Sequence, residues 1–148
     1  MRLVELPRNS EGHLFLHSMP GRYEPIEDFL TDIVLKNISC VVCLTSLEEI
    51  RQRSPAYARF LAGTVPWEHI TFPMWNSGMH DAPALEPLTR EIVKRLRQGR
   101  NVLIHCDSGI GRAGTVAVAV LTTFWPMVHN PQSSARLDEP DAANASRR

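Results

Sequence analysis

Short apolar runs alternate along this 148-residue chain with longer segments whose apolar residues recur every three or four positions. The runs at residues 3–6, 13–16, 38–45, 65–72 and 101–105 have the length and composition of strands. Helical spacing marks residues 25–36, 54–61, 84–98 and the chain from 112 onward, and a short helix opens at residue 46. This alternation predicts an α/β fold with a central, mainly parallel, twisted sheet and helices on both faces. The first two strands are expected to pair antiparallel at the sheet edge.

The segment 101–115 has a distinct three-part pattern, N-V-L-I-H-C-D-S-G-I-G-R-A-G-T. A buried strand ends at His105, a loop with two glycines follows, and small apolar residues then predict a buried helix. A strand, a tight loop and a helix N-terminus together present a row of backbone N–H groups to an anion. Since parallel sheets bind ligands at the carboxyl ends of their strands, this loop is the expected site.

The ends of this loop carry a cysteine and an arginine, Cys106 and Arg112. A helix N-terminus and a nearby cation favour a nucleophilic thiolate at Cys106. The planar guanidinium of Arg112 can hold two oxygens of a tetrahedral anion, which a lysine would do less well. Gly109 and Gly111 are expected to take positive φ and turn amides inward. This combination of groups predicts phosphoryl transfer to sulfur.

The string His105-Cys106-x5-Arg112, with glycines at 109, 111 and 114, resembles the signature of the cysteine-dependent protein tyrosine phosphatases. It is most similar to the small dual-specificity and kinase-associated-phosphatase-like members. The resemblance implies a phosphomonoester hydrolase that works through a phosphocysteine intermediate, without a metal or another cofactor. The phosphate is then expected to be held by Asp107, Ser108, Gly109, Ile110, Gly111 and Arg112.

Two positions depart from the pattern of this family. The mobile loop of the family often reads P-x-x-D, and aligning it on Pro73 puts Asn76 in the place of the general acid. An amide cannot donate a proton in this way, so Asp81 is expected to be the acid; the alternative is that it only caps the following helix. The second departure is Ala113, where many members have a hydroxyl that helps the thiolate leave.

Three further side chains have two possible roles each. Glu49, three residues after Ser46, completes a capping box; the family often carries an acidic residue here that orients the signature arginine. His105 is expected to orient the loop by a hydrogen bond rather than act as a base. Arg22 is expected to be a surface arginine, with a phosphate contact as the alternative.

Composition restricts the classes of partner and compartment. The formal net charge is zero, which argues against nucleic-acid and membrane-surface partners, and the apolar stretch 116–128 is too short to span a membrane. The three cysteines do not make a disulfide framework. Cys40 and Cys43 are three apart in a strand, so they are expected on opposite faces as core residues. No secretory signal is apparent, and a reducing cytoplasm suits a thiolate.

Residues 1–128 are therefore predicted to form one phosphatase-like domain, and residues 129–148 a disordered tail because they lack apolar periodicity. The expected partner is a phosphorylated protein, most simply at tyrosine, or a small phosphoester. Two alternatives remain: a pseudophosphatase that binds phosphoproteins without turnover, and a phosphatase of a non-protein ester. Oligomeric state and physiological substrate are not predicted.

Overall fold

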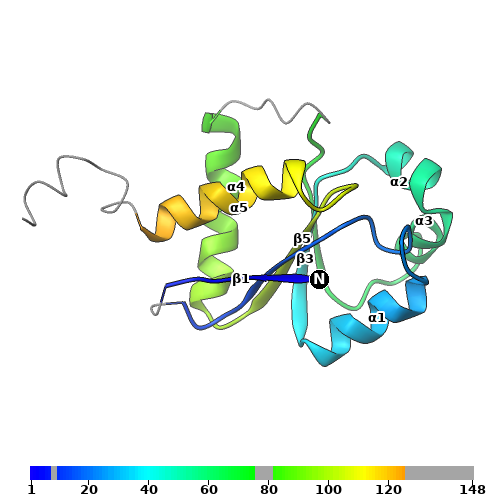
Figure 1. Ribbon diagram of the computed structural model, residues 1–148, viewed down its shortest axis with the longest axis horizontal. Helices are drawn as coiled ribbons and strands as arrows, with labels where there is room; N and C mark the ends of the chain where they lie inside the picture. Colours follow the sequence, from blue (N-terminus) through cyan, green and yellow to red (C-terminus); the bar gives the residue numbers. More distant parts are fainter. Residues whose placement is uncertain (8–9, 76–81, 126–148) are drawn as a thin grey trace, which may run out of the picture.

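A computed structural model of the protein describes residues 1–7, 10–75 and 82–125 (Figure 1). Its five-stranded sheet has the order β1-β2-β5-β3-β4, with all neighbours parallel except β1 and β2. The strands are β1 (Arg2–Val4), β2 (Leu14–His17), β3 (Ile38–Cys43), β4 (Glu68–Thr71) and β5 (Asn101–His105). The predicted α/β class and the antiparallel edge pair are confirmed, and β5 is the central strand.

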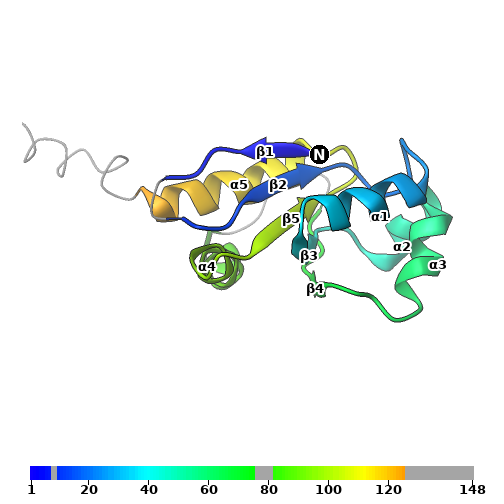
Figure 2. The same cartoon turned by 90° about the horizontal axis from the view of Figure 1, so that it is seen from below.

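Helices cover both faces of the sheet, as Figure 2 shows. They are α1 (Ile26–Leu35), α2 (Leu47–Arg53), α3 (Pro55–Leu61), α4 (Ala82–Arg97) and α5 (Gly111–Phe124). The apolar stripes of α4 and α5 pack with Leu14, Val102 and Ile104 in one core cluster. Those of α1, α2 and α3 pack with Val41 and Leu103 on the opposite face. Because residues 40–43 of β3 and 102–104 of β5 alternate between the two clusters, these stretches are continuously apolar.

The predicted element boundaries need small corrections. Strand β3 ends at Cys43 and β4 spans only Glu68–Thr71, although the N–H groups of Leu44 and Phe72 still donate to the carbonyls of His105 and Cys43. Helices α2 and α3 are separate: the Ser54 side chain accepts from the Tyr57 N–H and caps α3, and Pro55 occupies its first turn. Helix α4 begins at Ala82 and contains Pro87. The predicted tail, 129–148, lies outside the described residues.

The two cysteines of β3 point to opposite faces, as predicted from the two-residue period of a strand. Cys40 belongs to the cluster under α4 and α5, whereas Cys43 belongs to the cluster under α1 and α3. Both are fully or almost fully buried, and both are free thiols. Within the part of the chain that the structure describes, no helix is both long and apolar enough to cross a bilayer.

Candidate functional site

Cys106 lies directly after β5, at the carboxyl end of the central strand, and α5 begins five residues later at Gly111. Backbone bonds fix the start of this turn on both sides of Cys106. Leu44 N–H donates to the His105 carbonyl at 3.1 Å, and Met19 N–H donates to the Asp107 carbonyl at 3.0 Å. The Cys106 sulfur is buried and accepts the Gly109 N–H at 3.2 Å. The loop therefore closes around the sulfur, as expected of an anion cradle.

Gly109 is required at its position in this loop. Its φ is +83°, and a Cβ there would lie 2.8 Å from the carbonyl carbon of His17. The Gly109 carbonyl is held from outside by Arg2, whose Nη2 donates to it at 2.7 Å. The expectation of positive φ is wrong for Gly111, the first residue of α5. A Cβ added at Gly111 would meet no atom within 4 Å.

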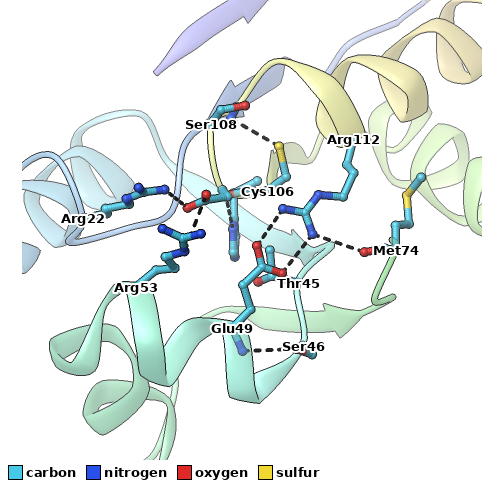
Figure 3. Close-up of polar contacts among 12 residues, drawn as sticks. Arg22, Thr45, Ser46, Glu49, Arg53, Met74, Cys106, Ser108 and Arg112 are labelled. Carbon is cyan, nitrogen blue, oxygen red and sulfur yellow. Dashed lines mark hydrogen bonds and ion pairs between the residues drawn. The ribbon is translucent and has the colours of Figure 1, made fainter. Parts of the chain in front are cut away.

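The Arg112 side chain is buried, and its fork is held from one side only (Figure 3). Its Nη1 donates to Glu49 Oε1 at 2.9 Å and to the Met74 carbonyl at 3.2 Å, and its Nη2 donates to Glu49 Oε2 at 2.7 Å. A guanidinium has five N–H donors, so two have no partner among the described residues, one on Nε and one on Nη2. These two donors lie on the same edge and can hold two oxygens of one anion.

The backbone of Glu49 takes part in a helix cap, and its side chain pairs with Arg112. Its backbone N–H donates to the Ser46 hydroxyl at 3.1 Å, which caps α2. Its carboxylate does not complete the capping box but pairs with both terminal nitrogens of Arg112. The carboxylate raises the pKa of the Arg112 guanidinium above its ordinary value and fixes its orientation. The interpretation of the Glu49 side chain as a cap is therefore wrong.

His105 is fully buried behind the loop and bonds Tyr57, a residue that the sequence analysis missed. The Nδ1 of His105 lies 3.3 Å from the Cys106 carbonyl, and Nε2 lies 3.0 Å from the Tyr57 hydroxyl. Because a carbonyl only accepts, the proton is on Nδ1, and Tyr57 donates to Nε2. Burial lowers the pKa of His105 to about 4 and raises that of Tyr57. The neutral imidazole fits the predicted orienting role.

Asp107 is flanked by two arginines on the open side of the loop (Figure 3). Arg22 Nη1 forms an ion pair and hydrogen bond with Asp107 Oδ1, and Arg53 Nε lies 4.0 Å from Oδ2. Arg22 is partly exposed, which agrees with its interpretation as a surface arginine, but it is paired with Asp107. The pair with Asp107 raises the pKa of Arg22. Neither partner could be found from the sequence, because 85 residues separate Arg22 from Asp107.

A cavity of about 520 Å³ opens beside the loop. Its lining residues are Ser46, Glu49, Gln52, Arg53, Pro73, Met74, Trp75 and Arg112. The predicted acid, Asp81, and the aligned Asn76 lie outside the described residues. Ala113 is fully buried, and the nearby Thr115 hydroxyl donates to the Gly111 carbonyl at 3.1 Å. Within the described ranges, no group of three His, Cys, Asp or Glu side chains is placed to hold a metal ion.

The fold is similar to that of solved phosphatases. A kinase associated phosphatase with its catalytic cysteine replaced by serine has a TM-score of 0.71 at 19% identity, over 83% of this chain and 72% of that one. The human tyrosine phosphatase-like serine/threonine/tyrosine-interacting protein has a TM-score of 0.61 at 17% identity, over 84% and 75%. The active form of Tk-PTP has a TM-score of 0.50 at 28% identity, over 76% and 68%.

The sequence comparisons place the chain in a family. No curated protein matches it significantly. The model of the family described as "Swiss Army Knife protein, DSP-PTPase phosphatase domain" matches residues 12–148, which include the whole loop from Cys106 to Arg112. The chain therefore belongs to the DSP-PTPase phosphatase domain family of the Swiss Army Knife proteins and is a protein-tyrosine-phosphatase-like hydrolase.

Proposed function

We propose that the protein hydrolyses phosphomonoesters through a phosphocysteine intermediate, with Cys106 as the nucleophile. The observation that carries this proposal is the placement of a buried thiol and an arginine fork at the two ends of one loop. The Cys106 sulfur accepts an amide N–H within the loop, and Arg112 keeps one two-donor edge free of described partners. A phosphate held by that edge and by the amides of residues 107–112 would place its phosphorus against the sulfur.

The reaction then has two steps. The Cys106 thiolate attacks phosphorus, so that an S–P bond forms while the ester P–O bond breaks and the leaving oxygen takes a proton from the acid. Water next attacks the phosphocysteine: an O–P bond forms, the S–P bond breaks, and the water's proton returns to the acid, now a base. Arg112 and the loop amides hold the equatorial oxygens in both steps.

Asp81 is our proposed general acid. The segment after β4 enters the site, because the Met74 carbonyl accepts from Arg112 and Trp75 lines the cavity. Among residues 73–83, Asp81 is the only carboxylate. Asp81→Asn should slow an alkyl- or tyrosine-like phosphoester by about 10²–10⁴-fold, and an activated nitrophenyl ester much less. Equal effects on both esters, or none, would exclude this role.

We propose phosphotyrosine-type groups on proteins as the substrate, in a reducing cytoplasm. The cavity has an apolar side made by Pro73, Met74 and Trp75, which suits the aromatic ring of a phosphotyrosine. Rates on phosphotyrosine and phosphothreonine peptides of one sequence would separate the tyrosine-specific and dual-specificity alternatives.

One observation favours a second candidate, a phosphoprotein-binding pseudophosphatase. Ala113 supplies no hydroxyl to the departing thiolate, and the hydroxyl of Thr115 is bonded to the helix backbone at Gly111. Slow hydrolysis of the intermediate would turn the protein into a stoichiometric trap. Rapid-quench kinetics with a nitrophenyl ester distinguishes three outcomes: steady turnover, a burst of one equivalent followed by slow turnover, and no phenolate release.

The decisive experiment is turnover of an aryl phosphate by the pure protein, with vanadate as a competitive control. Vanadate-sensitive turnover that disappears in Cys106→Ser is the expected result. A protein that binds phosphotyrosine peptides without releasing phosphate would support the pseudophosphatase. A protein that does neither would overturn both functions.

A further inference from the structure

Two arginines at the rim of the site have no assigned role in the chemistry above. Arg22 comes from the loop after β2 and Arg53 from the last turn of α2, and both face Asp107 in the loop (Figure 3). Arg53 also lines the cavity that contains Arg112. The rim therefore holds two cations for one carboxylate, which leaves a net positive charge beside the proposed phosphate cradle.

The two arginines are held very differently. Arg22 is bonded to Asp107, and its guanidinium carbon lies 4.8 Å from the centre of the Tyr23 ring, a cation–π contact. Arg53 is 48% exposed, and its Nε is 4.0 Å from Asp107, which is an ion pair without a hydrogen bond. Such exposed ion pairs contribute roughly 0–1 kcal/mol, so Arg53 can exchange this contact for another anion at little cost. Its terminal nitrogens make no hydrogen bond to a described residue.

We propose that Arg53, with Arg22 and Asp107 behind it, binds a second anionic side chain of a peptide substrate. This inference rests on the proposed function, since it assigns the flanking specificity of the same site. In an extended peptide, residues two apart are about 7 Å apart and share a face. That spacing fits within a cavity of about 520 Å³ that is lined by both Arg112 and Arg53. The anion, a carboxylate or a second phosphate, would lie two residues from the phosphotyrosine.

The balance of charge favours a peptide over a small polyphosphate. Among the described charged residues that line the cavity, Glu49 and Arg112 pair with each other. This leaves the charge of Arg53, because its nearest described carboxylate, Asp107, is already bonded to Arg22. One free cation suits one additional anion, whereas a ligand with several phosphates would bring more negative charge than the rim neutralises. The exposed apolar side chains near the loop, Trp75 and Ile110, also suit a peptide with an aromatic phosphoester.

The test compares three phosphotyrosine peptides of one neutral sequence, with alanine, glutamate or phosphothreonine two residues from the phosphotyrosine. We expect the anionic peptides to have the higher kcat/KM. Arg53→Gln should reduce the ratio of anionic to neutral peptide about 10-fold, mainly through KM, because a charged hydrogen bond is lost. The two anionic peptides distinguish a carboxylate from a phosphate as the preferred second group.

Arg51→Gln is the matched control. Arg51 is on the same helix with the same charge, but it lines a different cavity with Pro55 and Ala62. A ratio that falls equally in both variants would show a general charge effect and overturn the inference. An unchanged ratio in Arg53→Gln would also overturn the inference. The same holds if Arg53 matters only for a small bisphosphate compared with its monophosphate, and not for the peptides.

Failure of the inference can be told apart from failure of the proposed function. Binding of the same three peptides to Cys106→Ser, measured by calorimetry, needs no turnover. If the wild type does not release phosphate but Cys106→Ser binds the anionic peptides more tightly through Arg53, the inference stands and the hydrolase proposal fails. If turnover proceeds with no Arg53-dependent preference, the inference alone fails.

Discussion

Two arginine–glutamate pairs in this molecule have the same chemistry but use different edges of the guanidinium. Arg95 of α4 donates to Glu68 of β4 from Nε at 2.9 Å and from Nη2 at 2.5 Å, next to Cys40. Arg112 donates to Glu49 from Nη1 and Nη2, next to Cys106. The first pair occupies the Nε edge of its guanidinium, and the second leaves that edge open.

The cysteines beside these pairs, Cys40 and Cys106, differ in the groups that surround the sulfur. Both lie on the same face of the sheet, and their exposed fractions are 0% and 1%. Burial first, and then Glu68, raises the pKa of Cys40 to about 11, so that it remains a thiol at neutral pH. Cys106 is at the end of its strand, where an amide and the open edge of an arginine meet. Position at a strand end, and not exposure, separates a core thiol from a candidate nucleophile.

The largest expected effect comes from exchanging the sulfur itself. Cys106→Ser should reduce turnover of an aryl phosphate by roughly 10³-fold or more, because the hydroxyl is a far weaker nucleophile. Cys40→Ser should alter stability but retain turnover. Steady-state rates, together with the thermal midpoints of both variants, check this. Comparable losses of activity in two folded variants would refute the distinction between the cysteines.

The two arginines provide the second contrast. Arg112→Lys should lower kcat about 10²–10³-fold, since a point charge cannot hold two phosphate oxygens in the way a fork does. Arg95→Lys should leave kcat near the wild-type value, because the described partners of the Arg95 fork are Glu68 and Glu91, outside the loop. A wild-type kcat in Arg112→Lys would mean that the open edge does not hold phosphate.

Acid should destabilise the region around His105 and the region around Glu68 in different pH ranges. The folded-state pKa of His105, about 4, is below its ordinary value of 6.5, so the unfolded chain binds the extra proton first. Stability should therefore fall as pH decreases from 6.5 to 4, by up to about 3 kcal/mol. His17, whose pKa burial also lowers, adds in the same direction. The hydrogen bond with Arg95 lowers the pKa of Glu68 to about 2. The corresponding loss of stability falls between pH 4.5 and 2, and it is smaller because the Glu68 side chain is exposed.

Urea unfolding at a series of pH values from 7 to 3 would measure these losses. His105→Asn should flatten the slope between pH 6.5 and 4, and Glu68→Gln should flatten only the slope below 4.5. A wild-type protein with constant stability between pH 6.5 and 4 would contradict a neutral, buried His105.

The sheet and the loop could be predicted because their information is local. The periodicity of apolar residues indicates the strands and helices, and the run from His105 to Arg112 contains the proposed nucleophile, the glycine turn and the cation in eight consecutive residues. The element ends were less exact: β4 spans Glu68–Thr71 within the predicted run 65–72, and α4 begins at Ala82, two residues before the predicted start.

The partners of the loop could not be predicted, because the topology of the sheet brings them together. Tyr57 and His105 are 48 residues apart, and Glu49 and Arg112 are 63 apart. No pattern of spacing relates such residues, and Tyr57 had no signal beyond its place in an apolar helix. For Glu49 the capping box was the stronger local signal, and only the resemblance to the phosphatases offered its contact with Arg112.

The smallest effect should come from Glu49→Gln, which tests whether the orientation of Arg112 matters separately from its presence. The amide can accept one of the two hydrogen bonds but not the charge-assisted pair, so the fork is held less firmly. We expect kcat to fall about 10-fold with little change in KM, because the lost alignment matters most in the transition state. The thermal midpoint should change little, because the backbone N–H of residue 49 still donates to the Ser46 hydroxyl that caps α2.

Glu48→Gln is the control for this change, since Glu48 is exposed on the same turn of α2 and has the same charge. Glu68→Gln is the control from the other region: it breaks a similar bidentate pair at Arg95 and should leave kcat near the wild-type value. If Glu49→Gln lowered the thermal midpoint while kcat stayed constant, Glu49 would be a structural partner only, and the two arginine–glutamate pairs would be equivalent after all.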